Sequence, residues 1–121
     1  MEKKQVLWVS RHTMTEDQRK DLERIMGGPV ELDVWSDTVR DVEELRPRIR
    51  RADAVAAVLP TEKLAELMKI TGRRPVLQAK SARVATGRFM VQPGGAAEQE
   101  FAFVHQGWQQ ILDIRIRTRA L

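Results

Sequence analysis

The feature that most constrains the fold is the regular alternation of short apolar segments with segments of helical periodicity. Residues 5–9, 30–35, 54–59 and 76–79 are short, apolar or alternating, and rich in β-branched residues, which is typical of strands. Between them, apolar residues recur at the spacing of one helix face. Strands that alternate with helices predict a mainly parallel sheet. We therefore expect one α/β domain over residues 1–121, with the order β-α-β-α-β-α-β.

The boundaries of the expected helices are marked by capping residues. Thr15 can cap the first helix, with Gln18 completing a capping box, and Gly27 can end it. Pro47 interrupts a second helix, expected at about residues 39–52, and predicts a kink or two short pieces. Thr61 is expected to cap the third helix.

The last third of the chain has a different pattern. Residues 88–92 and 100–105 are expected to be strands around a loop at 93–95. Leu112, Ile114 and Ile116 alternate with polar residues, which predicts a further strand with a buried apolar face. We expect these segments to be antiparallel additions to one edge of the sheet, and they are a candidate dimer surface.

The arginines of this tail allow two interpretations. Arg115, Arg117 and Arg119 occupy alternate positions, as in a surface that follows a nucleic-acid backbone. They also fit a solvated strand face opposite the apolar one. Because no aromatic residues are interleaved with them, we favour the solvated face and expect no long nucleic acid as a partner.

Composition excludes several classes of protein. The 121 residues contain no cysteine, which excludes disulfides, zinc ribbons and thiol nucleophiles. The apolar run 54–60 is far too short to cross a bilayer, and the N-terminus does not resemble a signal peptide. We therefore expect a cytoplasmic protein without a membrane partner. The net charge of +4 favours anionic ligands, and so short a chain favours a homodimer.

Polar and cationic residues follow each of the four expected parallel strands. In an open α/β sheet, ligands bind beyond the carboxyl ends of the strands. Helix N-termini and cations at that edge suit a phosphate group, although capping alone would explain some of the hydroxyls. The candidate ligand-binding residues are Ser10, Arg11, His12, Thr13, Ser36, Asp37, Thr38, Thr61, Lys80, Ser81 and Arg83.

The two histidines receive different interpretations. His12 is either a general acid or base, or a partly buried residue packed beneath the first helix. His105, at the end of an expected strand, is expected to be a structural donor. A metal site would need both histidines together with carboxylates, without any HExxH spacing, so we expect no metal and no cofactor.

Several familiar motifs are missing. No GxGxxG follows the first strand, and there is no GxxxxGK[ST] loop, which argues against a dinucleotide site and a P-loop. No acidic pair follows the first strand, as a phospho-receiver domain would need, and no GxSxG elbow is present.

Two segments resemble the small CRISPR-associated ring nucleases. The segment SRHTMTEDQ at 10–18 is similar to the Ser/Thr-(Arg)-His cluster that follows their first strand. The segment AAVLPTEKLAELM at 56–68 is similar to their third strand, Leu-Pro turn and following helix. The resemblance covers about half of the chain and does not extend beyond Arg83.

The resemblance implies a fold and an activity. The fold would be a Rossmann-like three-layer homodimer that binds cyclic oligoadenylate and cleaves it without a metal, through attack of a ribose 2′-OH on the adjacent phosphorus. Only Ser10, Arg11 and His12 match the family motif by position. Arg11 and Lys80 would stabilise charge, and His12 would transfer a proton. The role of Lys80, like those of Ser81 and Arg83, follows from topology alone.

Two other functions fit the sequence. The same edge of the sheet could bind a nucleotide or cyclic nucleotide without cleaving it, which only a turnover assay would distinguish. Alternatively, the chain could be an interaction protein that uses the Ile/Arg tail as its surface and binds no small ligand, because a fold of this kind does not fix a function.

Overall fold

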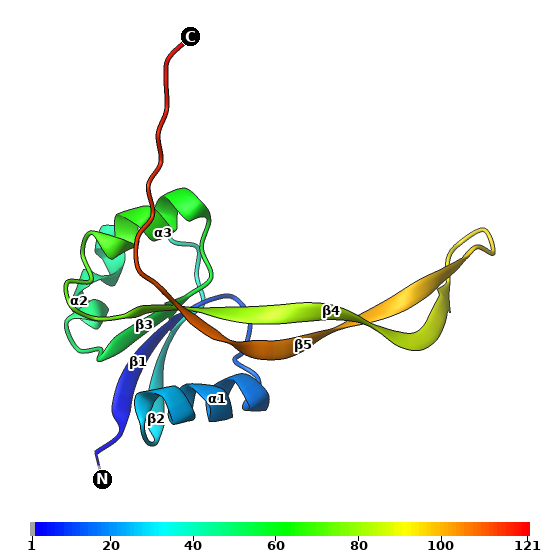
Figure 1. The fold of residues 1–121 in the computed structure, drawn as a ribbon, viewed down its shortest axis with the longest axis horizontal. Helices are drawn as coiled ribbons and strands as arrows, with labels where there is room; N and C mark the ends of the chain where they lie inside the picture. Colours follow the sequence, from blue (N-terminus) through cyan, green and yellow to red (C-terminus); the bar gives the residue numbers. More distant parts are fainter. Residues whose placement is uncertain (1) are drawn as a thin grey trace.

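The computed structural model describes residues 2–121 and shows an α/β protein with a mixed five-stranded sheet (Figure 1). The spatial order of the strands is β2-β1-β3-β4-β5, in which the first four are parallel and β5 is antiparallel to β4. The strands are β1 (Lys4–Val9), β2 (Val30–Trp35), β3 (Ala54–Ala57), β4 (Val76–Val91) and β5 (Ala97–Ile111). The α/β class and the antiparallel edge are therefore confirmed.

Helices cover both faces of the sheet because successive strand residues point to opposite sides. Val6 and Trp8 of β1 pack with Leu22 of α1 (Glu16–Met26) on one face. Leu7 and Val9 face the other way, toward the 3₁₀ helix η1 (Val42–Leu45), α2 (Arg46–Ile49) and α3 (Thr61–Met68). The core is thus divided into two apolar clusters by the sheet. Within residues 2–121, no helix combines the length and apolar character needed to cross a membrane.

The capping prediction for α1 is confirmed. The Thr15 hydroxyl accepts a hydrogen bond from the Gln18 backbone N–H at 3.1 Å, and the Gln18 side chain accepts one from the Thr15 N–H at 2.9 Å. Gly27 ends the helix with φ = 81°, a conformation that glycine adopts without steric cost. The helix that follows β1 is therefore fixed at both ends by its own sequence.

The two other helical segments differ from expectation in detail. The segment around Pro47 forms two short pieces, η1 and α2, and is shorter than the expected range of 39–52. The expected cap at Thr61 is wrong, because Pro60 is the N-cap of α3 and no side chain caps this helix. Thr61 is already its first helical residue. Proline is tolerated at this N-cap because it has no backbone N–H group, and an N–H there would have no partner within the helix.

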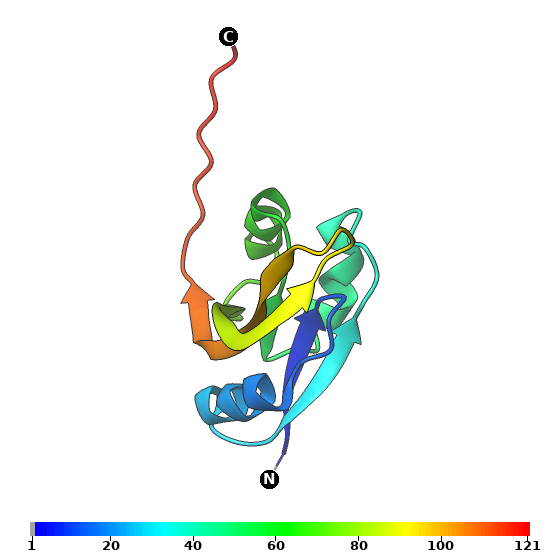
Figure 2. The same ribbon diagram turned by 90° about the vertical axis from the view of Figure 1, so that its right-hand side faces the viewer.

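The hairpin formed by β4 and β5 is much longer than expected. Strand four does not end at residue 79, as predicted, but continues to Val91, and β5 returns from Ala97. The two strands pair antiparallel along nearly their whole length, with register shifts at Lys80/Ser81 and Ala85/Phe89. Beyond the body of the sheet they form a two-stranded ribbon, residues 81–104, which we call the arm. Figure 1 shows it projecting to the right, and Figure 2 views it along its length.

The predicted strand at the C-terminus is absent. Residues 112–121, which we call the tail, have no regular secondary structure and lead away from the body (Figure 1). The predicted buried face is also wrong, because Leu112 is 81% exposed and Ile116 is 50% exposed. Only Ile114 packs against the core. A period-two pattern indicates that a segment can pair as a strand. In the part of the chain that the structure describes, however, no strand lies beside the tail, so the tail remains unpaired.

Candidate functional site

A cavity of about 360 Å³ lies at the carboxyl edge of the parallel strands. β1 lies between β2 and β3, so the connections that leave β1 and β3 run to opposite sides of the sheet. Such a switch in strand order opens a crevice beyond the strand ends, where α/β proteins bind ligands. The polar residues lining this carboxyl-edge cavity are Ser10, Arg11, His12, Asp37, Thr38 and Lys63.

The loop after β1 is held in place by three hydrogen bonds. The Trp8 indole N–H donates to the His12 carbonyl at 2.9 Å, and the His12 N–H donates to the Ser10 hydroxyl at 3.0 Å. The Ser10 N–H donates to the Trp35 carbonyl at 3.1 Å, which joins this loop to the end of β2. Ser10 is buried, at 5% exposure. Its hydroxyl therefore shapes the loop, while the His12 ring remains exposed.

Two cations line the cavity from different elements. The Arg11 guanidinium donates to the Thr38 hydroxyl and so connects the loops after β1 and β2. Lys63, in the first turn of α3, donates from Nζ to the Arg40 carbonyl at 2.7 Å. Asp37 is the one carboxylate among the lining residues of this cavity. The lining side chains carry one more positive than negative charge, and Glu66, 3.9 Å from the Lys63 Nζ, offsets part of it. Two cations at the cavity favour an anionic ligand.

The structure brings together some of the predicted site residues. Ser10, Arg11, His12 and Asp37 line the carboxyl-edge cavity. Thr13 and Ser36 line a neighbouring hollow of about 260 Å³, which shares the loop after β1.

Other predicted site residues lie elsewhere. Thr61 faces a separate hollow beside the end of β5. Lys80, Ser81 and Arg83 do not reach the cavity, because β4 runs past the carboxyl edge instead of ending there. The Arg83 guanidinium lies over the Phe101 ring at 3.8 Å. A loop was expected at these three residues, but they lie within the strand β4.

Lys63 was missed in the sequence. Its position offered a signal, because the first turn of a helix that follows a parallel strand lies at the same edge as the strand end.

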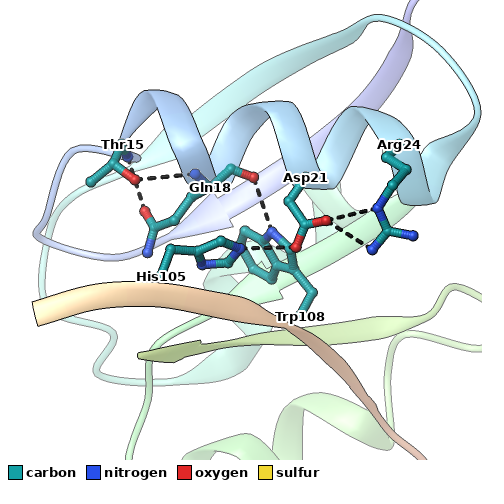
Figure 3. A network of polar contacts seen from close by, with 6 residues as sticks. All are labelled: Thr15, Gln18, Asp21, Arg24, His105 and Trp108. Atoms are coloured by element: carbon teal, nitrogen blue, oxygen red, sulfur yellow. Dashed lines mark hydrogen bonds and ion pairs between the residues drawn. The ribbon is translucent and has the colours of Figure 1, made fainter. Parts of the chain in front are cut away.

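His105 makes a structural contact, as expected (Figure 3). Its Nε2 lies 2.9 Å from Oδ2 of Asp21 in α1, and Trp108 donates its indole N–H to the Gln18 carbonyl at 3.0 Å. The hydrogen bond from His105 and the ion pair with Arg24 lower the pKa of Asp21. These contacts fasten the base of β5 to α1. The exposed ring of His12, in contrast, does not pack beneath α1.

Other features define the limits of the site. Within residues 2–121, no group of three or more histidine or acidic side chains is arranged to hold a metal ion. A hollow of about 400 Å³ between β1, β2 and α2 lies away from the carboxyl edge. Its Arg48 is paired with Asp33 at 2.9 Å and covers the Trp35 ring, so this arginine is already engaged.

Fold and cavity together define an α/β protein with a cavity at the switch in strand order, whose mostly apolar lining carries two cationic side chains. Comparison with protein-family models, curated proteins and solved structures found no match. The resemblance to ring nucleases therefore rests on the two sequence segments alone.

Proposed function

We propose that this protein is a metal-independent ring nuclease with a Rossmann-like fold, which binds cyclic oligoadenylate in the carboxyl-edge cavity. The observation that carries the proposal is the meeting of Arg11, His12 and Lys63 in one cavity at the switch in strand order. The first two come from the segment that resembles the family, and Lys63 supplies the second cation in place of Lys80.

The charges of the cavity suit a phosphodiester. Arg11 and Lys63 can each donate charge-assisted hydrogen bonds to phosphate oxygens. Both are already oriented by bonds to neighbouring loops, so little ordering is needed when a ligand binds. Their positive charge would also stabilise the additional negative charge that develops on phosphorus in the transition state.

The proposed reaction is an internal transfer. The ribose 2′-oxygen attacks the adjacent phosphorus, the bond to the 5′-oxygen breaks, and the products carry a 2′,3′-cyclic phosphate and a 5′-hydroxyl. His12 accepts the proton of the 2′-OH or protonates the leaving 5′-oxygen. Positioning these groups in line supplies a large part of such a rate enhancement.

The size of the cavity favours a dimer. Its volume of about 360 Å³ is at the small end for ligand sites, and a ring of four nucleotides is larger. Two copies related by a two-fold axis would present two such cavities to a symmetric ring. We therefore include a cytoplasmic homodimer in the proposal.

The decisive experiment is incubation of the purified protein with cyclic tetra-adenylate in EDTA, followed by mass spectrometry of the products. We expect linear fragments with a 2′,3′-cyclic phosphate. H12A and H12Q should abolish cleavage and retain binding, because H12Q keeps a polar side chain of similar size but cannot transfer the proton. An intact ring with wild-type protein, or normal cleavage by both variants, would contradict the proposal.

A second candidate is a binding module without turnover. The observation that favours it is that both cavity cations are already bonded to neighbouring loops, as suits a rigid receptor. Calorimetric titration would then show that the wild-type protein binds the ring. Mass spectrometry would detect no cleavage products at any time point.

A further inference from the structure

The arm exposes apolar side chains and an unpaired strand edge. Phe103 is 78% exposed, and Phe89, Met90, Val91 and Val104 are also exposed. β5 is the last strand of the sheet, so the N–H and C=O groups along its outer edge have no strand beside them. A two-stranded ribbon without a further layer is only marginally stable in water. The arm therefore has the properties of a surface that another chain covers.

In the described part of the chain, the tail lacks a partner strand, just as the outer edge of β5 does. It is extended and alternates apolar residues with arginines, yet it pairs with no strand. Among the described residues, Arg117 and Arg119 form no ion pair, and Arg115 pairs only with the exposed Asp113. The tail is thus a strand-like segment without a partner strand.

The side-chain alternation of β5 matches that of the tail. Along β5, Glu98 and Glu100 lie on one face of the strand, and Phe101 and Phe103 lie on the opposite face. Residues directly opposite one another on paired strands share a face. One antiparallel register therefore places Arg117 and Arg119 beside the two glutamates. The same register places Ile116 beside Phe101.

The charges of the arm select between its two edges. In the arm, β4 carries the cations Arg83 and Arg88, whereas β5 carries Glu98 and Glu100. Among the described residues, neither glutamate forms an ion pair. An arginine-rich strand would meet like charge on β4 and opposite charge on β5, so the outer edge of β5 is the matching one.

The tail of the same molecule cannot reach that edge. Ile114 packs against the core and anchors the start of the tail. Residues 115–121 can then span at most about 25 Å when fully extended. The strand from Glu100 to Ile111 spans about 36 Å at roughly 3.3 Å per residue. The matching tail must therefore come from another molecule.

We propose that the tail of one copy of this chain adds as a strand to the outer edge of β5 in a second copy, and that the exchange is reciprocal. Each arm gains a third strand, and the two copies form a closed dimer with the same contact made twice. This assembly goes beyond the proposed activity, because it requires neither a ligand nor turnover.

Charge reversal in two full-length variants tests this assembly. E98K/E100K places cations on both the arm and the tail, whereas R117E/R119E places acids on both. We expect the wild-type protein to sediment as a dimer and each variant to sediment as a monomer. An equimolar mixture of the two variants should restore the dimer, because each arm then meets a tail of opposite charge.

The mixture also shows whether the variants are monomeric because of charge repulsion or because of misfolding, since misfolded variants would not associate on mixing. R50E/R73E reverses two exposed arginines of the body whose side chains form no ion pair among the described residues, and it should remain dimeric. A monomeric wild-type protein, a dimer in either charge-reversal variant alone, or monomers in the mixture would overturn the proposal. Nuclease activity is read separately and decides only the proposed function.

Discussion

The hydrogen bond between Asp21 and His105 joins residues far apart in the sequence and fastens the base of the arm to α1. Its acidic member has a lowered pKa, chiefly through the hydrogen bond with His105 and then through Arg24. A carboxyl group whose pKa is lowered by folding stabilises the folded state above its ordinary pKa of 3.8. That contribution disappears as the pH falls through the lower pKa of the folded protein.

The variant D21N should therefore unfold at a lower urea concentration than the wild-type protein at pH values well above 3.8. The two unfolding midpoints should converge as the pH is lowered further, because protonation removes the charge that the substitution also removes. D17N, an exposed position in the same helix, is the control. An equal, pH-dependent loss in D17N would show that the effect is general to α1 and not specific to this pair.

Arg11 is expected to contribute ligand affinity and not proton transfer. Because hydrogen bonds to charged groups contribute about 1.5–3 kcal/mol, R11A should raise the Kd for cyclic tetra-adenylate about 10- to 100-fold. The H12A background prevents turnover during calorimetric titration. R51A removes an exposed arginine outside the cavity and should leave the Kd unchanged. Equal effects of R11A and R51A would indicate non-specific electrostatic binding.

At this scale, the sequence predicted the residues whose position follows from a strand end. Ser10, Arg11 and His12 follow β1 directly, so the rule for parallel sheets placed them correctly at the carboxyl edge. Lys80 was placed wrongly because strand four was expected to end at residue 79. The residues after 79 are mostly polar, so no apolar pattern in the sequence showed that the strand continues to Val91. The sequence could not predict that the Ser10 hydroxyl accepts a hydrogen bond from the His12 N–H, because this bond depends on the local turn of the backbone.

At the scale of elements, the two longer helices begin in different ways. α1 has a complete capping box, whereas α3 begins at Pro60 without a side-chain cap. T15A should therefore lower the free energy of unfolding by about 1 kcal/mol, since it removes one acceptor from the helix start. T61A should change it by less than about 0.5 kcal/mol, as is usual for exposed positions without such a role.

Urea unfolding monitored by circular dichroism measures both variants under the same conditions. T61A thus serves as the matched control, because it removes the same atoms from the start of another helix. A loss in T61A as large as that in T15A would contradict the assignment of Pro60 as the N-cap.

The parallel strands were predictable because each is short, apolar and flanked by helical periodicity. The hairpin was placed correctly around residues 93–95, but its length was not, because its strands are exposed on both faces and lack a clear apolar alternation. The tail has the strongest period-two pattern in the chain and yet is unpaired. An alternation of apolar and polar residues indicates that a segment can pair as a strand. It does not indicate which strand the segment pairs with.

At the scale of the whole molecule, the arm and tail should respond to protein concentration while the body does not. In the proposed dimer, the outer edge of β5 and the tail gain backbone hydrogen bonds. Amide hydrogen exchange in residues 97–104 and 115–121 should therefore slow as the concentration rises, whereas exchange in β1 should stay constant. If amide hydrogen exchange in the tail does not depend on protein concentration, the proposed pairing of each tail with a second copy is wrong.

The edge-to-face contact between Trp8 and Trp108 gives the molecule an optical reporter of its own. The ring centroids are 6.0 Å apart, and the pair spans the junction between β1 and the base of β5. Because the chain has three tryptophans and no tyrosine, its ultraviolet absorption and emission come mainly from these indoles. Loosening of the arm from the body would change the near-ultraviolet dichroism of this pair while the far-ultraviolet signal of the helices persists. Motion at that junction can therefore be followed without attaching a dye.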